Sequence, residues 1–271
     1  MTEHTVLPPI GLGTFRLQEQ VVIDSVLSAL ALGYRHIDTA TFYENEAAVG
    51  KAIRASGVPR EEIFVTTKIW WDQLDGDGPI RSLEGSLERL GLTQVDLALI
   101  HWPSPNGEVP MADYLDGLGR ARAQGLTRHI GVSNFTIAQI DEALALPVGK
   151  YLVTNQVEVQ PYLANRKLVE HCQRRGLQVT GYMPLAVGKV MKDPVLKAIG
   201  ERHGASAAQV ALAWVVSRGI AVIPASTNPQ HQQSNLEALE LTLNAEDIAQ
   251  IDALDAGERI ANPPFAPHWD Q

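Results

Sequence analysis

The sequence predicts one (β/α)8 barrel domain over residues 1–271, with two extra helices and a C-terminal tail. The first observation behind this is strict alternation, because eight short apolar runs are each followed by a segment of helical periodicity. The second is spacing, since the runs end near residues 13, 38, 67, 101, 132, 156, 182 and 224. The steps of about 25 to 42 residues suit βα units. Because period alone does not establish closure, a doubly wound open sheet remains the alternative.

The expected strands are the apolar runs themselves, at 10–15, 35–39, 62–69, 94–102, 129–134, 152–159, 177–185 and 220–226. The helices between them carry both periodicity and end signals. Val22 and Val26 lie at helical spacing, and Gly33 stands where a helix C-terminus favours glycine. Thr136 suits a helix N-cap. The expected helices are 19–33, 45–57, 79–91, 111–125, 136–146, 165–176, 193–204, 206–219, 229–240 and 244–255. One of the two helices before the last strand and the final helix are additions to the barrel plan.

Composition excludes several classes of protein. The net charge of −9 and the sequence pI of about 5.4 disfavour nucleic-acid binding through a basic face. No uninterrupted apolar stretch is long enough to span a membrane. The single cysteine, Cys172, cannot form an internal disulfide, and "MTEHTVLPP" lacks the features of a signal peptide. We therefore expect a cytoplasmic protein, a monomer without nucleic-acid or membrane partners.

Polar residues end three successive strands of the predicted barrel. Asp38 ends the second strand and Tyr43 follows on its loop, while Lys68 ends the third strand and His101 the fourth. Because chemistry in such barrels occurs at the C-terminal mouth, these four side chains are the candidate site. Each also has an ordinary structural interpretation. Asp38 could be a helix cap and Tyr43 a half-buried loop aromatic. Lys68 could be a solvated strand end and His101 a core histidine. Together, however, they would bury charge without purpose unless they are paired.

This group suits proton delivery. A lysine cation beside a tyrosine favours the phenolate, which is expected to lower the pKa of Tyr43. Asp38 would hold Lys68 in place, and a neutral His101 could donate a hydrogen bond to a carbonyl oxygen. Since the group contains no hydride source, a cofactor should supply the reactive species.

Several ordered motifs resemble the aldo-keto reductase family. "GYRHIDTATFYENEAAVG", "TTKIW" and "LIHWP" resemble the segments around its catalytic residues, while "IGVSNF", "TNQVEVQPYL" and "GYMPLA" resemble its cofactor-binding strand ends. The resemblance runs from Ile10 to Asp255 and is nearest to the bacterial type B 2,5-diketo-D-gluconate reductases. It implies NAD(P)H-dependent reduction of an aldehyde or ketone on a (β/α)8 barrel. Tyr43 would then be the general acid, with Lys68, Asp38 and His101 completing the catalytic group.

The resemblance also implies where a cofactor binds. Gly13 and Thr14 would lie under the nicotinamide, and Tyr182 would stack on it. Ser133, Asn134 and Gln156 would hold its carboxamide. Leu185 and Gly188 would run beside the pyrophosphate, and Ser226, Thr227, Asn228 and Asn235 would reach the adenosine. The "GLGTF" stretch is not the dinucleotide fingerprint of an open sheet, because it lacks the third glycine and opens no helix.

One segment departs from the family pattern. Ala225 stands where a lysine is common after the last strand, and His231 stands in place of an arginine. Residues 223–235 contain no lysine or arginine. Asn228 and Pro229 still resemble a helix start, whose dipole and N–H groups favour phosphate. We therefore expect NADPH to be the cofactor, with a weakened preference over NADH and with His231 contributing charge when protonated.

The substrate pocket is expected to contain Phe15, Trp70, Trp102 and Trp269, which lie beside the strand ends or on the tail. A short loop after the fourth strand suggests an open pocket for small polar carbonyl compounds, such as methylglyoxal or 2,5-diketo-D-gluconate. Two other functions remain open: a Schiff-base aldolase using Lys68, and a non-catalytic nucleotide-binding barrel. No metal is expected, because the histidines show neither H-x-H nor H-E-x-x-H spacing.

Overall fold

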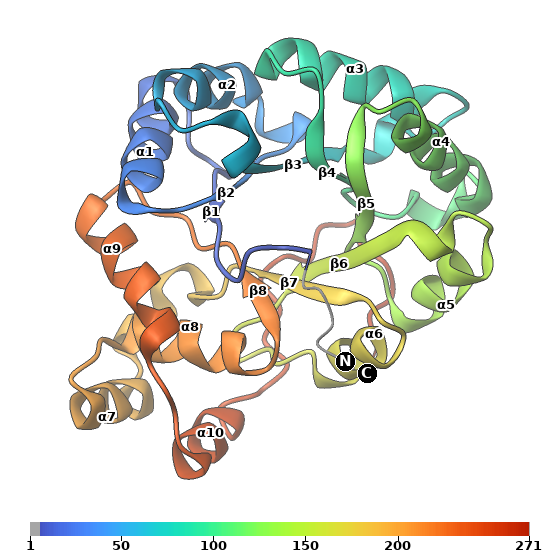
Figure 1. Ribbon diagram of the computed structural model, residues 1–271. Helices are drawn as coiled ribbons and strands as arrows, with labels where there is room; N and C mark the ends of the chain where they lie inside the picture. The colour runs from blue at the N-terminus through green and yellow to red at the C-terminus, as the bar shows by residue number, and fades with distance from the viewer. Residues whose placement is uncertain (1–5, 271) are drawn as a thin grey trace.

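The computed structural model describes residues 6–270 and contains a closed parallel barrel (Figure 1). Residues 1–5, which include part of the stretch judged for a signal peptide, and residue 271 lie outside the described part. The strands pair in sequence order: β1 (Leu12–Gly13), β2 (His36–Asp38), β3 (Phe64–Ile69), β4 (Val95–Ile100), β5 (Thr127–Ser133), β6 (Leu152–Glu158), β7 (Gln178–Tyr182) and β8 (Ile220–Val222). The circle closes where Ile10 bridges Val222 and the Gly11 N–H donates to the Val222 carbonyl at 2.8 Å. The predicted barrel is confirmed, and the open sheet is excluded.

The α-helices form a ring around the barrel (Figure 1). They are α1 (Glu19–Leu32), α2 (Glu46–Ala55), α3 (Gly78–Leu90), α4 (Met111–Ala123), α5 (Ile137–Ala145), α6 (Arg166–Arg174), α7 (Pro194–His203), α8 (Ala207–Ser217), α9 (Pro229–Glu237) and α10 (Ala245–Asp252). Short 3-10 helices occupy Thr41–Tyr43, Arg60–Glu62, Trp71–Gln73, Pro105–Gly107, Gly149–Tyr151, Ala186–Lys192 and Ala238–Glu240. The two extra helices, α7 and α10, are joined by Asp247, which accepts from Arg202 at 2.6 Å and His203 at 2.7 Å.

Seven of the eight observed strands are shorter than the predicted apolar runs, whereas β5 begins two residues earlier than predicted, at Thr127. The run at 177–185 forms a strand only to Tyr182, because Met183 has φ 49° and turns the chain out of the sheet. The predicted run at 10–15 contributes just Leu12–Gly13, since Ile10 makes an isolated bridge and Thr14 begins the loop. Apolar residues therefore continue beyond the strands into the loops that line the mouth.

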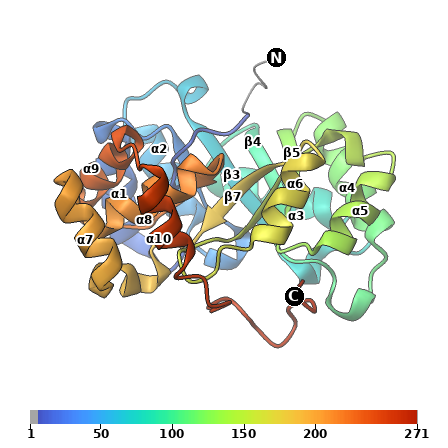
Figure 2. The same cartoon turned by 90° about the horizontal axis from the view of Figure 1, so that it is seen from below.

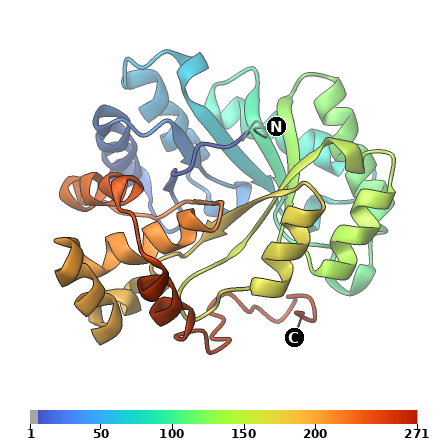
Figure 3. The same ribbon diagram turned by 60° about the horizontal axis from the view of Figure 1, so that its bottom comes forward.

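The barrel interior is filled at one end and open at the other. Leu7 packs with Leu97, Leu99 and Ala221 and so plugs the N-terminal end. Larger buried side chains such as Trp214 pack between the strands and helices. After α10 the tail runs across the opposite end of the barrel (Figures 2 and 3). Among residues 6–270, the helices are too short or too polar to cross a bilayer.

The contact between α2 and α3 depends on a glycine, and this can be tested. A Cβ at Gly50 would lie 2.0 Å from the Leu90 carbonyl oxygen, whereas a Cβ at Gly85 would meet only the end of the long Arg89 side chain, at 3.0 Å. Alanine usually stabilises a helix interior relative to glycine by about 1 kcal/mol. We expect that gain for Gly85→Ala, whereas Gly50→Ala should lose about 1–3 kcal/mol through overpacking. Urea unfolding of both variants measures this, and equal stability would contradict the close contact.

Candidate active site

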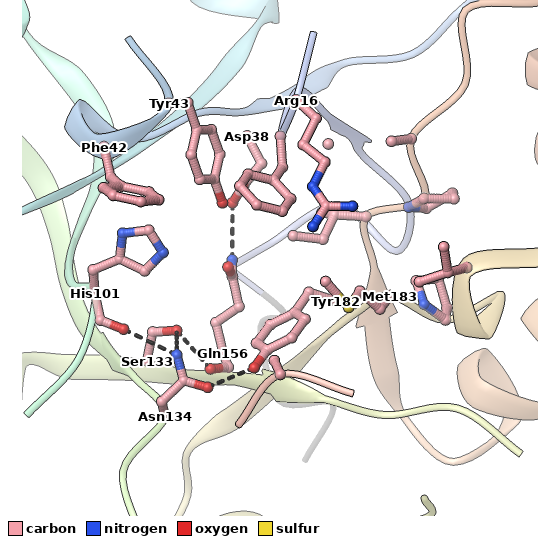
Figure 4. A pocket seen from close by; sticks show the side chains of 18 of the residues that line it. Arg16, Asp38, Phe42, Tyr43, His101, Ser133, Asn134, Gln156, Tyr182 and Met183 are labelled. Atoms are coloured by element: carbon pink, nitrogen blue, oxygen red, sulfur yellow. Dashed lines mark hydrogen bonds between the residues drawn. The ribbon is translucent and has the colours of Figure 1, made fainter. Parts of the chain in front are cut away.

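The four predicted residues meet at the C-terminal mouth of the barrel. Asp38 ends β2, Lys68 is the penultimate residue of β3, and His101 directly follows β4. Because these strands are parallel neighbours, their ends converge. Tyr43 reaches the same place from the 3-10 turn after β2 (Figure 4). Lys68 is 0% exposed and Asp38 is 1% exposed, so neither is a solvated strand end.

Lys68 is the centre of this group. Its Nζ donates to the carboxylate of Asp38, to the Thr39 carbonyl at 2.9 Å and to the Tyr43 hydroxyl at 3.0 Å. The second oxygen of Asp38 accepts from Gln156 Nε2 at 2.8 Å. Burial by itself would lower the pKa of Lys68, but Asp38 and Tyr43 together raise it above its ordinary value. Lys68 is therefore a protonated, fully coordinated ammonium group.

The Tyr43 phenol is held at the edge of the cavity. Its ring lies 5.0 Å from the Phe15 ring and 5.7 Å from the His101 ring. Lys68 donates to the phenol oxygen, and no residue among 6–270 accepts the Tyr43 O–H. That hydrogen is thus available to a ligand in the cavity.

The expected lowering of the Tyr43 pKa is wrong for this structure. Burial raises the pKa, and the opposing effect of Lys68 is smaller, so the net direction is upward. The sequence indicated that Lys68 is near Tyr43, but it could not show that the effect of burial on the Tyr43 pKa exceeds the effect of this cation. As a result the phenol retains its proton at neutral pH.

His101 is a neutral imidazole beside this pair. Burial first, and Lys68 second, hold the pKa of His101 well below its ordinary value. The described residues offer no hydrogen-bond partner to its Nδ1. Asn134 fixes the backbone at this point by donating to the His101 carbonyl at 3.0 Å. A neutral ring of this kind can donate a hydrogen bond to a carbonyl oxygen without carrying charge.

A cavity of about 910 Å³ is lined by three of the four residues, Asp38, Tyr43 and His101 (Figure 4). Leu185, Val187 and Gly188 also line it. This volume is at the upper end for small-molecule and cofactor pockets. It can hold both a large cofactor and a small substrate.

Residues 9–256 match the model of the Aldo/keto reductase family. The chain belongs to this family. Methylglyoxal reductase DkgB of Escherichia coli O157:H7 is 51% identical over 265 residues, 97% of this chain and 99% of that protein. Glyoxal reductase of Bacillus subtilis (strain 168) is 38% identical over 95% of this chain and 92% of its own length. A crystal structure provisionally named 2,5-diketo-D-gluconic acid reductase B superposes with TM-score 0.94 at 41% identity, covering 98% of this chain and 94% of that one.

Membership confirms the resemblance predicted from the motifs, and this aldo/keto reductase is an oxidoreductase of carbonyl compounds that uses a nicotinamide cofactor.

Most residues predicted to bind the cofactor do line the cavity: Gly13, Ser133, Asn134, Gln156, Tyr182, Leu185 and Gly188. Thr14 does not; it is buried and donates to the Asp38 carbonyl at 2.9 Å.

The amide and hydroxyl groups expected at the nicotinamide are oriented by one another. The Ser133 hydroxyl donates to the backbone carbonyl of Gln156 at 2.8 Å, and the Asn134 Oδ1 accepts from the Tyr182 hydroxyl at 2.8 Å. Gln156 uses its Nε2 on Asp38, and its Oε1 forms no bond to a described residue. These residues of the aldo/keto reductase therefore fit a carboxamide, because the Oε1 of Gln156 is an oriented acceptor on the cavity wall.

The loop after β8 lines the cavity only at its start, residues 223–225. Ala225 lines the cavity, but the residues predicted to reach the adenosine do not: Ser226, Thr227, Asn228, His231 and Asn235. Asn228 caps α9 by accepting from the Gln230 N–H at 2.8 Å, as expected from its position before proline. Gln232, which the sequence did not single out, is 0% exposed and donates to the Ser226 carbonyl at 2.8 Å and to the Ser25 carbonyl at 3.0 Å. It ties this loop to α1.

Arg16 was also missed by sequence reasoning. It lines the cavity and points inward, with its guanidinium 5.0 Å from the Phe15 ring (Figure 4). Its φ of 66° places it in the left-handed region, and the sequence before it contains no signal that predicts this conformation. A cation therefore stands at the cavity although residues 223–235 supply none.

The predicted substrate wall is partly corrected. Phe15, Trp70 and Trp102 line the cavity, but Trp269 does not; it packs behind Trp102 at 6.0 Å between ring centroids. Phe265 from the same tail lines the cavity instead, because the tail turns at Pro263 and directs this ring inward. Phe42 and Trp71 also line the wall. Within residues 6–270, no three histidine, cysteine or acidic side chains are grouped to hold a metal ion.

Proposed function

We propose that the protein is an NADPH-dependent reductase of aldehydes and ketones in which Tyr43 is the general acid. The observation that carries this proposal is the bond from Lys68 Nζ to the Tyr43 hydroxyl at 3.0 Å. Because Lys68 is the donor, the phenolic hydrogen remains available for the substrate oxygen. The developing negative charge on the phenol would then be stabilised by a cation that is already in place.

The remaining residues support this assignment. His101, being neutral, donates to the carbonyl oxygen and directs it toward Tyr43. Asp38 compensates the buried charge of Lys68, and Gln156 restrains Asp38. When bound, a dihydronicotinamide supplies the hydride that this group of residues lacks.

The same geometry disfavours a Schiff-base aldolase. A lysine nucleophile must lose its proton and reach the substrate, which requires a depressed pKa. Lys68 is instead 0% exposed, bonded to three oxygens and raised in pKa. Borohydride trapping should leave Lys68 unmodified in the presence of carbonyl substrates.

NADPH is the cofactor that we propose, through a site with few cations. Half-buried Ser226 and exposed Thr227 and Asn228 surround the start of α9, whose dipole favours phosphate. Buried Gln232 holds this loop in place before any ligand arrives. Arg16 offers its charge to the phosphates that both nicotinamide cofactors share.

The cofactor preference can be measured directly. We expect a kcat/KM ratio of NADPH over NADH above one, because the start of α9 offers its dipole and free N–H groups to the additional phosphate of NADPH. His231→Ala, in the first turn of α9, should lower this ratio, whereas Arg16→Gln should weaken both cofactors and leave the ratio unchanged. A wild-type ratio below one would rule out NADPH as the preferred cofactor.

The substrates that we propose are small polar carbonyl compounds such as methylglyoxal and 2,5-diketo-D-gluconate. The names of the relatives from Escherichia coli and Bacillus subtilis support this choice. The test is oxidation of NADPH and NADH at 340 nm with methylglyoxal, 2,5-diketo-D-gluconate and simple aldehydes. Absence of turnover with the whole panel would favour a non-catalytic nucleotide-binding barrel. We further propose that the chain acts as a monomer of one domain.

A further inference from the structure

A buried carboxylate next to the cavity has no role in the proposed reaction. Glu158 is the last residue of β6 and is 0% exposed. It lies two residues beyond Gln156, so both side chains point to the same face of the sheet. An ionised carboxylate this deeply buried is costly unless it is well hydrogen-bonded. Its position therefore requires an explanation.

The partners of Glu158 belong to the C-terminal tail. Its two oxygens each accept the Ile260 N–H at 3.0 Å, and Oε2 also accepts the Ala261 N–H at 2.8 Å. Gln160 Nε2 is a weaker donor at 3.3 Å and also bonds the Glu258 carbonyl at 2.9 Å. All of these donors are neutral amides, and backbone amides stabilise the charged form of a carboxylate. Glu158 thus holds the tail by charge-assisted bonds.

The segment held in this way becomes a wall of the cavity. Ala261, Pro263 and Phe265 all line it. The Phe265 ring lies 5.6 Å from the Trp70 ring and 5.5 Å from the Trp102 ring, both edge to face. Ala261 and Phe265 are separated by only a short stretch of chain. The bond from Ala261 to the Glu158 carboxylate therefore restricts where the Phe265 ring can lie.

A second bond secures the far end of the tail. The carboxylate of Asp270 accepts the Ile137 N–H at the start of α5, at 3.0 Å to its nearer oxygen. The tail therefore crosses the mouth between two carboxylate–amide attachments (Figure 2). At Glu158 the carboxylate is on the barrel, and at Asp270 it is on the tail. Only the first is buried and adjacent to the cavity wall.

We propose that Glu158 is a positioning residue that sets the substrate-facing wall by binding the amides of Ile260 and Ala261. This rests on the proposed carbonyl reduction at the same cavity. Carbonyl compounds large enough to touch Phe265 depend on this attachment, whereas the smallest ones do not. Cofactor binding is independent of it, because the Glu158 side chain bonds to the tail and to Gln160 and does not itself line the cavity.

The test compares Glu158→Gln with Glu170→Gln, a matched change on α6 at a side chain that is 54% exposed and pairs with Arg174. Amide hydrogen exchange at residues 260 and 261 is measured without substrate, and steady-state kinetics are measured with methylglyoxal and phenylglyoxal at saturating NADPH. In Glu158→Gln we expect exchange at these amides to accelerate at least about tenfold. The KM for phenylglyoxal should rise about tenfold, while its kcat and the Kd for NADPH change less than about threefold. Methylglyoxal and the control variant should behave as in wild type.

Unchanged exchange in Glu158→Gln would overturn the attachment, and faster exchange with an unchanged KM for phenylglyoxal would overturn the positioning role. If Glu158→Gln does not fold, Ala261→Pro removes one donor from the tail side, and the same rise in KM for phenylglyoxal is expected. A wild-type protein without any carbonyl turnover would refute the proposed function, whereas the exchange measurement would still decide the attachment.

Discussion

Replacing Tyr43 with phenylalanine is expected to reduce kcat about 10²- to 10⁴-fold while leaving NADPH bound as tightly as in wild type. The hydrogen of the phenol has no acceptor among residues 6–270, and its oxygen already accepts from Lys68. Because burial raises the pKa of Tyr43, this proton is retained at neutral pH until it is needed. Phenylalanine preserves the ring contacts with Phe15 and His101 and removes only the hydroxyl.

Single-turnover kinetics and fluorescence titration with NADPH measure the two halves of this prediction. Tyr151→Phe is the matched control, because Tyr151 is 41% exposed and lies outside the cavity. Retention of more than about a tenth of wild-type kcat in Tyr43→Phe would mean that another group delivers the proton.

Lys68→Met should lower kcat to a similar extent, because the phenol loses the cation that stabilises its charged form. The side chain is the donor in bonds to Asp38, Thr39 and Tyr43, so no other residue can replace it. Exposed Lys51→Met, on α2, is the control for the same substitution. Circular dichroism and NADPH binding confirm that the barrel is intact before rates are compared.

Adding Asp38→Asn to Lys68→Met should cost little more, since Asp38 is proposed to act through Lys68. Groups that operate as a unit show losses that are far from additive. Asp38→Asn alone should lower kcat, because Lys68 then loses its charge partner. Fully multiplicative losses in the double variant would show that the two residues act separately.

The arrangement of strands and helices could be predicted because its causes are local. Apolar runs, helical spacing and end signals such as Gly33 and Thr136 act within a few residues of one another. The convergence of Asp38, Lys68 and His101 could be predicted too, since neighbouring parallel strands bring their C-terminal ends together. The length of β7 was overestimated, because the left-handed turn at Met183 has no marker in the apolar pattern.

By itself, the sequence determined the alternation of eight strands with helices, the two extra helices and the family, since these depend on periodicity and on motifs at strand ends. Closure of the barrel was decided by the tertiary structure, because it depends on the pairing of the first strand with the last. Only the tertiary structure decided which tail aromatic faces the cavity, Phe265 rather than Trp269, because the tail has no periodic contact with the barrel. It alone revealed Arg16, which a left-handed turn brings to the cavity, and Glu158, whose partners Ile260 and Ala261 lie on the tail far along the chain. It also decided the direction of the Tyr43 pKa, because desolvation depends on everything packed around the ring, whereas the sequence indicates only the charged neighbour.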